Sequence, residues 1–259
     1  MNNNLPLSTN DLIIGYKGKK EARVAGPLHF SIPKGALTGL IGINGIGKST
    51  LLKTLSGLLP PLAGEIKINN QNIFKLSSQE RAKYISLVLT TPINGGFATV
   101  EEIVKMGRYP YTNWQFAVSK TDKGIIDNAL ASVNLEAKRN HLFAELSDGN
   151  KQKVMIAKAL AQDTPLMILD EPTVHLDIKN KFIILQLLQK LAKEHQKTIL
   201  FSGHDLDYML TFCDQLMLMT EGALSVNFPE HLIESGAITK AFDLKPQEVK
   251  NLFFRKNIV

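Results

Sequence analysis

A glycine-rich segment near the start of the chain constrains the fold more than any other feature. Residues 42–49 read GINGIGKS, which matches the pattern G-x-x-x-x-G-K-[ST]. The segment follows an apolar run, residues 36–41, and precedes leucines at helical spacing, so it joins a predicted strand to a predicted helix. Glycines let the backbone curl around a phosphate, and the helix N-terminus adds partial positive charge. We therefore predict a nucleotide site, with Lys48 at the phosphates and the Ser49 hydroxyl near Mg²⁺.

The composition is that of an ordinary globular chain. It has 259 residues, of which 44% are hydrophobic and 21% charged, and this argues against disorder, collagen and coiled coil. A chain of this size buries about 70–75% of its unfolded surface and needs no disulfide or structural metal. Cys213 is the only cysteine, which excludes an intrachain disulfide and favours a reducing compartment.

The charge and the hydropathy pattern exclude several classes of protein. The net charge of +6 mildly favours polyanionic partners, but the basic residues are dispersed and form no stripe with interleaved aromatics. We therefore expect no nucleic-acid partner. The first ten residues, MNNNLPLSTN, lack the basic and apolar regions of a signal peptide. No run of 18 apolar residues occurs, so we expect that the chain does not cross a bilayer by itself.

Strand-like and helix-like segments alternate, which predicts an α/β fold with a largely parallel sheet. An amphipathic helix is predicted over residues 178–193, with its apolar face formed by Ile178, Phe182, Leu185, Leu188 and Ala192. Ser77 with Glu80 and Thr99 with Glu102 have the spacing of capping boxes, which mark helix starts. Residues 99–161 show a helical pattern without a convincing strand, and this predicts a helical insertion into the sheet domain. Strands are predicted at residues 85–89, 166–169, 198–201 and 215–219, and a hairpin at residues 65–68 and 72–74.

Two acidic residues follow a predicted buried strand. Residues 166–171 read LMILDE, an apolar run that ends in Asp170 and Glu171. In an open parallel sheet, ligands bind outside the carboxyl ends of the strands, so these carboxylates are expected to face Lys48. We assign Asp170 to Mg²⁺ and Glu171 to the attacking water, which it would orient or deprotonate.

A second group of motifs gives a family resemblance. Residues 146–153, LSDGNKQK, resemble the LSGGE/Q-[RK]-Q-[RK] signature of ABC-type ATPases. Residues 174–177, VHLD, are similar to the D-loop of that family, and His204 is similar to its switch histidine. Tyr16 occupies the place of the aromatic residue that stacks on adenine. The motifs occur in the family's order from about residue 11 to residue 226.

The resemblance implies a P-loop, RecA-like α/β fold: a mostly parallel sheet, an N-terminal antiparallel β part and an inserted α-helical subdomain. The whole chain, residues 1–259, would form one domain. Within it, residues 1–98 would form the β-subdomain and the phosphate-loop part, 99–161 the helical insertion with the signature, 162–226 the rest of the sheet core and 227–259 a C-terminal helical tail. It also implies ATP and Mg²⁺ as ligands and a head-to-tail homodimer, in which Ser147 and Gly149 of one copy cover the nucleotide of the other.

The expected site residues follow from the motifs and the resemblance together. The catalytic residues would be Glu171, His204 and Lys48, and the metal ligands Ser49, Asp170 and Thr90. The nucleotide-binding residues would be Tyr16, Gly42, Asn44, Gly45, Gly47, Lys48, Ser49, Thr50, Ser147 and Gly149.

Simpler structural roles compete for some of these positions. Tyr16 could be plain packing on an edge strand. Asp177, in the D-loop-like segment, could only cap the helix that follows. A histidine at a helix start, such as His204, is often structural.

The sequence departs from the family pattern at three positions. Asp148 replaces the first glycine after the signature serine, where a carboxylate would repel a phosphate unless it points away or pairs with Lys151. Asn150 replaces the usual Glu or Gln. The place of the family's Q-loop glutamine is taken by Thr90, or alternatively Thr91, whose hydroxyl reaches less far than an amide.

Residues 102–111, EIVKMGRYPY, resemble a segment of ATP-binding subunits of importers for ferric siderophores, haem and cobalamin. Alternatively, the segment is a helix ended by Gly107 and Pro110, with its tyrosines packed locally. The resemblance implies two membrane-spanning permease subunits, an external substrate-binding protein and a peripheral position on the cytoplasmic face of the inner membrane. Two other readings stay open: a soluble ABC ATPase, for example in iron–sulfur assembly, and a weakly hydrolysing nucleotide-regulated module.

Overall fold

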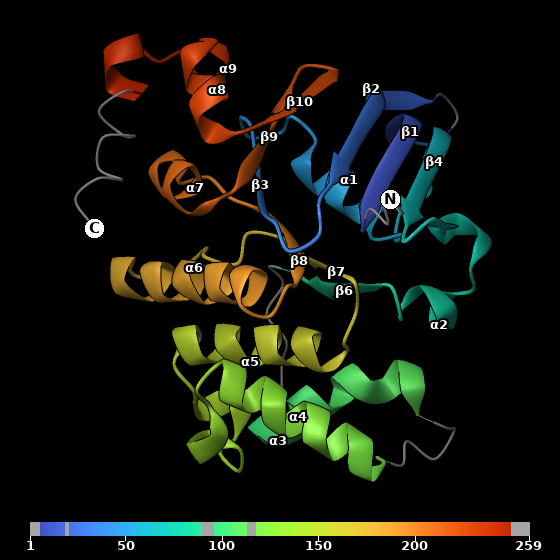
Figure 1. Ribbon diagram of the computed structural model, residues 1–259, viewed down its shortest axis with the longest axis vertical. Helices are drawn as coiled ribbons and strands as arrows, with labels where there is room; N and C mark the ends of the chain where they lie inside the picture. The colour runs from blue at the N-terminus through green and yellow to red at the C-terminus, as the bar shows by residue number, and fades with distance from the viewer. Residues whose placement is uncertain (1–5, 19–20, 90–95, 113–117, 250–259) are drawn as a thin grey trace.

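The computed structural model of the protein describes residues 6–18, 21–89, 96–112 and 118–249. The strands form two separate sheets, and a group of helices forms a layer at the lower end of the molecule (Figure 1). This combination of a mostly parallel sheet, an antiparallel N-terminal sheet and a helical part confirms the predicted α/β fold.

The N-terminal sheet is antiparallel and has the strand order β2-β1-β4-β5. Its strands are β1 (Leu7–Tyr16), β2 (Ala22–Ile32), β4 (Ala63–Ile68) and β5 (Gln71–Asn72). The predicted hairpin is present, but its second strand ends at Asn72 rather than at residue 74. The Asn72 side chain accepts a hydrogen bond from the Phe74 amide, and this cap starts the 3-10 turn Ile73–Lys75 in place of further strand.

The second sheet has the strand order β10-β9-β3-β8-β7-β6. Its strands are β3 (Leu37–Ile41), β6 (Ile85–Val88), β7 (Leu166–Leu169), β8 (Thr198–Ser202), β9 (Gln215–Thr220) and β10 (Ala223–Asn227). All pairs are parallel except that of β9 with β10. Every residue of β3, β7 and β8 is buried, as expected of parallel strands that are covered on both faces.

Three helices pack around this sheet: α1 (Lys48–Leu55), α6 (Ile178–Lys193) and α7 (Leu206–Phe212). Helix α6 has its predicted bounds, and Leu185, Leu188 and Ala192 are at most 1% exposed. Ile178, which the sequence places on the same apolar face, is 77% exposed. It is the first residue of α6, directly after the cap Asp177, where the helix has not yet reached the sheet.

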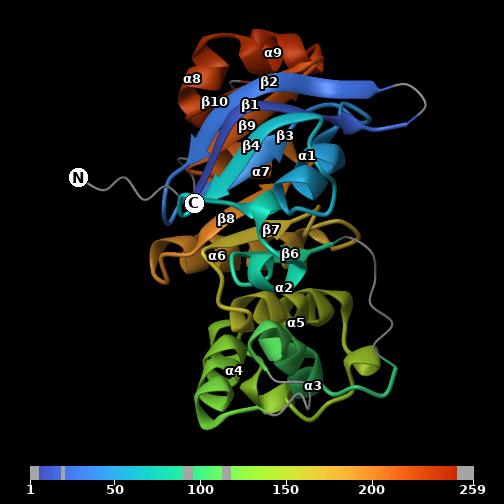
Figure 2. The same ribbon diagram turned by 90° about the vertical axis from the view of Figure 1, so that its right-hand side faces the viewer.

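The predicted helical insertion forms a layer below α6 (Figures 1 and 2). The capping boxes at Ser77 and Thr99 are both present. The insertion contains α3 (Val100–Lys105), α4 (Lys120–Ser132) and α5 (Asp148–Ala161), with 3-10 turns at Met106–Tyr111, Glu136–Lys138 and Phe143–Glu145. Helix α5 lies between α6 and the other helices of the insertion (Figure 1).

The GRYPY segment is partly structural. The Arg108 guanidinium is buried, and its Nε lies 2.7 Å from Asp122 Oδ1. Its Nη1 donates to the Ala161 carbonyl at 2.8 Å, and the group stacks on the Tyr111 ring at 4.0 Å. The alternative in which the tyrosines pack locally fits Tyr111 in part, since its ring lies against Arg108. Tyr109 and Tyr111 nevertheless remain 42% and 38% exposed.

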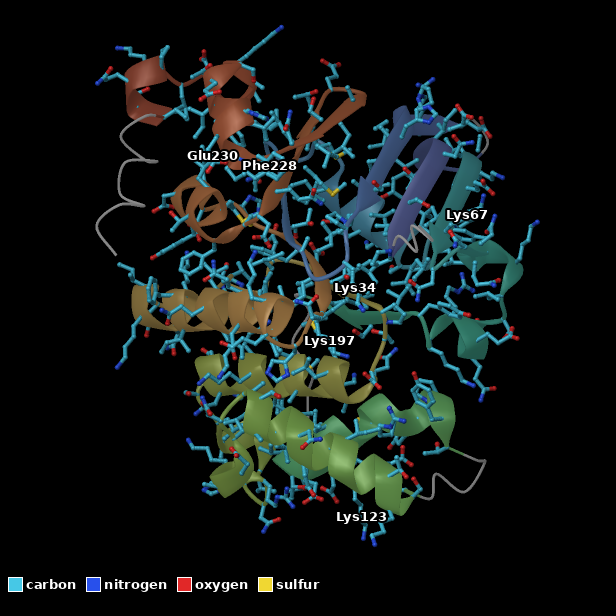
Figure 3. The ribbon with its side chains drawn as sticks, in the orientation of Figure 1. Lys34, Lys67, Lys123, Lys197, Phe228 and Glu230 are labelled. Atoms are coloured by element: carbon cyan, nitrogen blue, oxygen red, sulfur yellow. The ribbon has the colours of Figure 1, made fainter. Side chains whose placement is uncertain are left out.

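The remaining described helices are α2 (Ser78–Arg81), before β6, and α8 (Pro229–Glu234) and α9 (Ala237–Phe242) after β10. Residues 252–254, an apolar end in the sequence, lie outside the described residues. Lysines are dispersed, with Lys67 on the antiparallel sheet and Lys123 on the insertion (Figure 3). Among the described residues, no helix combines the length and the apolar character that a membrane span requires. Cys213 is buried, with its sulfur close to Gly39.

Candidate functional site: a phosphate loop facing an acidic strand end

The phosphate loop joins β3, at the centre of the parallel sheet, to α1. Gly47 has φ 114°, in the left-handed region, and a Cβ there would lie 2.3 Å from Val24 Cγ1. A glycine is therefore required at this position by both its backbone and its surroundings. Because Val24 belongs to β2, the loop is braced by the antiparallel sheet.

Lys48 is the buried cation of the loop. Its Nζ donates to the Gly42 carbonyl at 2.7 Å and to the Ile43 carbonyl at 3.2 Å, and the residue is 6% exposed. Burial lowers the pKa of Lys48, while the negative charges of Glu171 and Asp170 oppose that shift. A desolvated ammonium held among carbonyl groups is suited to binding an anion.

A cavity of about 410 Å³ opens beside the lysine. It brings the phosphate loop together with Glu171 and His204, two of the expected catalytic residues, although they are far apart in the sequence. Its lining residues are Asn44, Gly45, Gly47, Lys48, Ser49, Thr50, Glu171 and His204. Eight predicted site residues thus line one cavity.

The two acidic residues follow β7, as the sequence predicts, and a buried serine holds them. The Ser202 Oγ donates to Asp170 Oδ1 at 2.7 Å and accepts from the Glu171 amide at 2.9 Å. Ser202 is 0% exposed and ends β8, which pairs with β7. It therefore fixes the direction in which the chain leaves β7.

Glu171 and His204 contact each other directly. His204 Nε2 lies against Glu171 Oε1, within hydrogen-bond distance. The backbone of Glu171 has φ 49°, a left-handed conformation that is uncommon outside glycine. Strained backbone of this kind is found disproportionately at functional sites, where the surrounding structure holds it.

Tyr16 lies beside the loop rather than in the core. Its hydroxyl is 2.9 Å from the Thr50 Oγ1, and the residue is 47% exposed. Thr50 is buried in the first turn of α1. The Tyr16 ring is thus anchored next to the nucleotide-binding loop and remains open to solvent.

The signature residues lie at the start of α5, away from the cavity that contains Lys48. Ser147 occupies the N-cap position of α5, where its side chain forms no capping hydrogen bond, and it is exposed, as is Asp148. Asp148 forms no ion pair with Lys151 or with any other residue in the described ranges. Gly149 is buried, and a Cβ there would lie 2.6 Å from Asn180 Oδ1. Neither Ser147 nor Gly149 lines the cavity of its own chain.

Two further predictions on the D-loop and Q-loop positions have different outcomes. Asp177 is the cap of α6, since its Oδ1 accepts from the Asn180 amide at 2.7 Å. The helix-capping alternative therefore describes Asp177 in this structure. Thr90 and Thr91, the candidates for the Q-loop place, lie outside the described residues.

Sequence reasoning missed Ser202 and Asn180. Ser202 stands two residues before His204 and directly follows a predicted strand, which was the available signal. The sequence does not show that this strand lies beside the acidic one. Asn180 gave no signal, because its contact with Gly149 joins residues on different helices.

The residues in and beside the cavity fit Mg²⁺. Ser49 lines the cavity, and Asp170 directly precedes Glu171, which also lines it. Their hydroxyl and carboxylate oxygens are ligands that this ion prefers. The described residues contain no group of three or more His, Cys, Asp or Glu side chains able to hold a metal ion. Mg²⁺ does not require such a group, because it is commonly bound through one or two carboxylates together with substrate phosphates.

A model of the ABC transporter family matches residues 25–174, which include the phosphate loop, the signature and both acidic residues. The chain belongs to the ABC transporter family. The ATP-binding subunits of this family are ATPases, and this chain is an ABC-type ATPase.

Characterised relatives of this ABC ATPase align over most of its length. The iron(3+)-hydroxamate import ATP-binding protein of Bacillus subtilis is 39% identical over 218 residues, which cover 84% of this chain and 80% of that protein. The achromobactin transport ATP-binding protein of Dickeya dadantii is 32% identical over 249 residues, covering 96% of this chain and 91% of the relative.

Solved structures of ABC cassettes share the fold. One is an ATP-binding cassette in a dimeric post-hydrolysis state bound to ADP and Pi, with a TM-score of 0.72 and 26% sequence identity. The similarity covers 86% of this ABC ATPase and 98% of that chain.

Proposed function

We propose that the protein is the ATP-hydrolysing subunit of an importer for an iron–siderophore, haem or cobalamin-like ligand. The observation that carries the proposal is the single cavity shared by Lys48, Glu171 and His204. The similarity to subunits for iron(3+)-hydroxamate import and achromobactin transport supports the ligand class.

ATP would bind with its phosphates on the loop. Lys48 would contact the β- and γ-phosphates, together with amides of the loop residues Gly42, Asn44, Gly45 and Gly47 and of Thr50. Tyr16 would stack on the adenine. Its partial exposure and its anchoring to Thr50 support this role, because a preoriented ring loses little entropy on stacking.

Mg²⁺ would be held by Ser49, Asp170 and Thr90, and when bound it neutralises charge that develops on the phosphates. Ser202 supports this assignment, because its hydrogen bond to Oδ1 fixes the orientation of the Asp170 carboxylate beside the cavity.

Glu171 would orient and deprotonate the attacking water, with His204 holding the carboxylate in place. The contact of His204 Nε2 with Glu171 Oε1 supports this division. It constrains one oxygen of the carboxylate, and the other can accept the water's proton.

A second copy of the chain would complete the site. In a head-to-tail homodimer, Ser147 and the start of α5 would approach the γ-phosphate bound by the other copy. The exposure of Ser147 at a helix N-terminus supports this arrangement, as does the dimeric state of a related cassette.

Closing and opening of this dimer would drive two membrane-spanning permease subunits, which receive the ligand from an external substrate-binding protein. The ATPase would be peripheral, on the cytoplasmic face of the inner membrane. The exposed Tyr109 and Tyr111 of the insertion support a contact there, because exposed aromatic residues are enriched at interfaces.

The test is isolation of the protein with the membrane subunits that copurify in mild detergent, followed by reconstitution into liposomes. We expect Mg²⁺-dependent ATP hydrolysis and ATP-dependent uptake of a radiolabelled ferric siderophore, haem or cobalamin in the presence of the binding protein. If the protein hydrolyses ATP but no membrane subunit copurifies with it, the importer proposal is contradicted. If the full complex does not hydrolyse ATP, the assigned site is contradicted.

A further inference from the structure

The side chain of Gln162 joins the signature helix to the edge of the parallel sheet. Gln162 directly follows α5 and caps its C-terminus. Its Nε2 donates to the Ala82 carbonyl at 2.6 Å and to the Ile85 carbonyl at 2.8 Å. Both partners belong to the segment that enters β6, whereas Gln162 ends the helical insertion. One amide group therefore bridges the two parts of the fold.

The chemistry of the partners fixes the orientation of this amide. Backbone carbonyls only accept hydrogen bonds, so the nitrogen and not the oxygen of the Gln162 side chain must face them. β6 is the edge strand of its sheet and pairs only with β7 among the described strands. Without Gln162, the Ile85 carbonyl would have no donor from a neighbouring described strand. The hydrogen bond from Gln162 therefore supplies a donor at the open edge of the sheet.

Another segment of the insertion contacts the same turn of α5. The carbonyl of Ala161, the residue before Gln162, accepts from Arg108 Nη1 at 2.8 Å. A Cβ on Gly107 would lie 2.3 Å from the Lys158 carbonyl, so the two segments are in close contact. Two consecutive residues are thus hydrogen-bonded to different parts of the fold, Ala161 to the insertion and Gln162 to the segment entering β6.

The backbone after Gln162 has the geometry of a hinge. Asp163 has φ 51°, a left-handed conformation, and the chain then turns into β7. Hinges in proteins are a few residues at the ends of elements that absorb changes in backbone angle. The Gln162 side chain is bonded to the edge of the sheet directly before this turn, and it therefore restricts rotation of α5 about the turn.

Gln162 also lines a cavity of about 260 Å³, whose other lining residues come from the segment after α1, from α2 and its end, and from β6. Leu58, which is 61% exposed, is one of these lining residues. The bridge is therefore accessible from the surface and is not sealed in a core.

We infer that Gln162 is a positioning residue that sets the orientation of α5 and so presents Ser147, at the far end of the helix, to a second copy. A helix of 14 residues is about 21 Å long, so a small rotation at its C-terminal end displaces its N-terminal end by several ångströms. The inference rests on the proposed function in one respect, namely that Ser147 binds the nucleotide of another copy.

Loss of the bridge lowers the fraction of molecules in which α5 has the orientation required for pairing. An apparent dissociation constant rises in inverse proportion to the competent fraction. Nucleotide binding to a single copy does not involve α5, since Lys48 and its cavity lie on the other part of the chain. Loss of the bridge should therefore weaken dimer formation and leave the nucleotide affinity of a single copy nearly unchanged.

The experiment uses the purified full chain with Glu171→Gln, in which hydrolysis is blocked. Dimer formation is measured by sedimentation against ATP concentration, and nucleotide binding by a fluorescent ATP analogue at protein concentrations too low for pairing. We expect Gln162→Met, which keeps the length but removes the donors, to weaken dimer formation about tenfold and to change nucleotide binding less than twofold. Gln162→Lys, which restores a donor of similar reach, should recover most of the dimer.

The matched control is Gln189→Met on α6. It removes an amide donor to a backbone carbonyl, that of Phe212, away from the junction. Gln189→Met should leave both measurements within twofold. Hydrogen exchange provides a second readout: the amides of residues 85–88 should exchange faster in Gln162→Met than in the parent.

The outcomes separate the inference from the proposed function. If the parent forms no ATP-dependent dimer, the proposed head-to-tail site is wrong. If the parent dimerises and Gln162→Met dimerises equally well, the positioning role is wrong while the proposed function stands. Failure of Gln162→Lys to recover dimerisation, or equal weakening by Gln189→Met, also overturns the inference. If Gln162→Met does not unfold cooperatively, Gln162→Asn takes its place, with the same expected weakening.

Discussion

His204 Nε2 lies against Oε1 of Glu171, although 33 residues separate them in the sequence. The contact exists because β7 and β8 are parallel neighbours whose carboxyl ends meet at the same edge of the sheet. The chain leaves both strands beside Lys48, so a carboxylate and an imidazole converge on the cavity next to a buried cation. The following predictions test what this convergence does.

Replacing Glu171 by Gln should lower ATP turnover by about 10²–10⁴-fold, because it removes the base but preserves the shape of the side chain. ATP affinity should change by less than about threefold. Phosphate release and nucleotide binding measure the two quantities. Glu194→Gln, an exposed carboxylate at the end of α6, is the control and should keep full turnover. Undiminished turnover in Glu171→Gln would remove this residue from the base role.

Replacing Ser202 by Ala should reduce turnover about tenfold and raise the Mg²⁺ concentration needed for half-maximal activity. The substitution leaves Asp170 Oδ1 and the Glu171 amide without the hydroxyl that holds them. It should also cost about 1–3 kcal/mol of unfolding free energy, since a buried donor and acceptor lose their partner.

The control for Ser202 is Thr198→Val at the other end of β8. The Thr198 hydroxyl is also buried, and it accepts from the Gly35 amide. Thr198→Val should lower stability in denaturant titrations but leave the turnover of the folded protein and its Mg²⁺ dependence unchanged. A change in Mg²⁺ dependence in both variants would show that lost stability, rather than lost positioning of Asp170, accounts for the effect.

The effect of Gly149→Ala on stability should depend on residue 180. An alanine Cβ would displace Asn180 Oδ1, whose side chain also donates to Asp177 Oδ2 at 3.1 Å. In the parent, this cost should cancel or exceed the helix-propensity gain of alanine. In an Asn180→Ala background, the same substitution should be stabilising by a few tenths to about 1 kcal/mol. Equal effects in both backgrounds, measured by a double-mutant cycle, would exclude the contact as the reason for glycine.

The stability of the helical insertion should depend on pH through Asp122. Hydrogen bonds from Ser119, followed by the bond and charge of Arg108, lower the pKa of this carboxyl group. Its contribution is therefore complete above the unfolded-state pKa of about 3.9 and is lost as the pH falls through the lower folded-state pKa. Denaturant titrations between about pH 5 and pH 2 should show a smaller loss of stability for Asp122→Asn than for the parent. Asp127→Asn, an exposed position on the same helix, should lose stability as steeply as the parent.

Local patterns predicted the elements whose causes are local. The phosphate loop follows from glycine spacing, and the starts of α2 and α3 follow from side chains that bond amides three residues away. The bounds of α6 were predicted because Asp177 and the apolar period mark them in the sequence itself. The placement of Asp170 and Glu171 at the same sheet edge as the phosphate loop needed only the general rule for parallel sheets.

Relations between distant segments could not be predicted in this way. Ile178 fits the apolar period of α6 but lies before the helix meets the sheet, and periodicity alone does not say where packing begins. Arg108 is expected at a surface from its charge, yet Asp122 and the Ala161 carbonyl pair with it in the interior. The role of Ser202 depends on which strand lies next to β7, which a single sequence does not state.

The burial of Cys213 makes the protein convenient for thiol labelling. Its sulfur is enclosed near Gly39, and the chain has no other cysteine, so reagents should leave the native protein largely unmodified. A cysteine introduced at the exposed Ser147 would then be the single reactive site. Fluorophores or spin labels placed there could report the approach of two signature helices during turnover, without first removing a native residue.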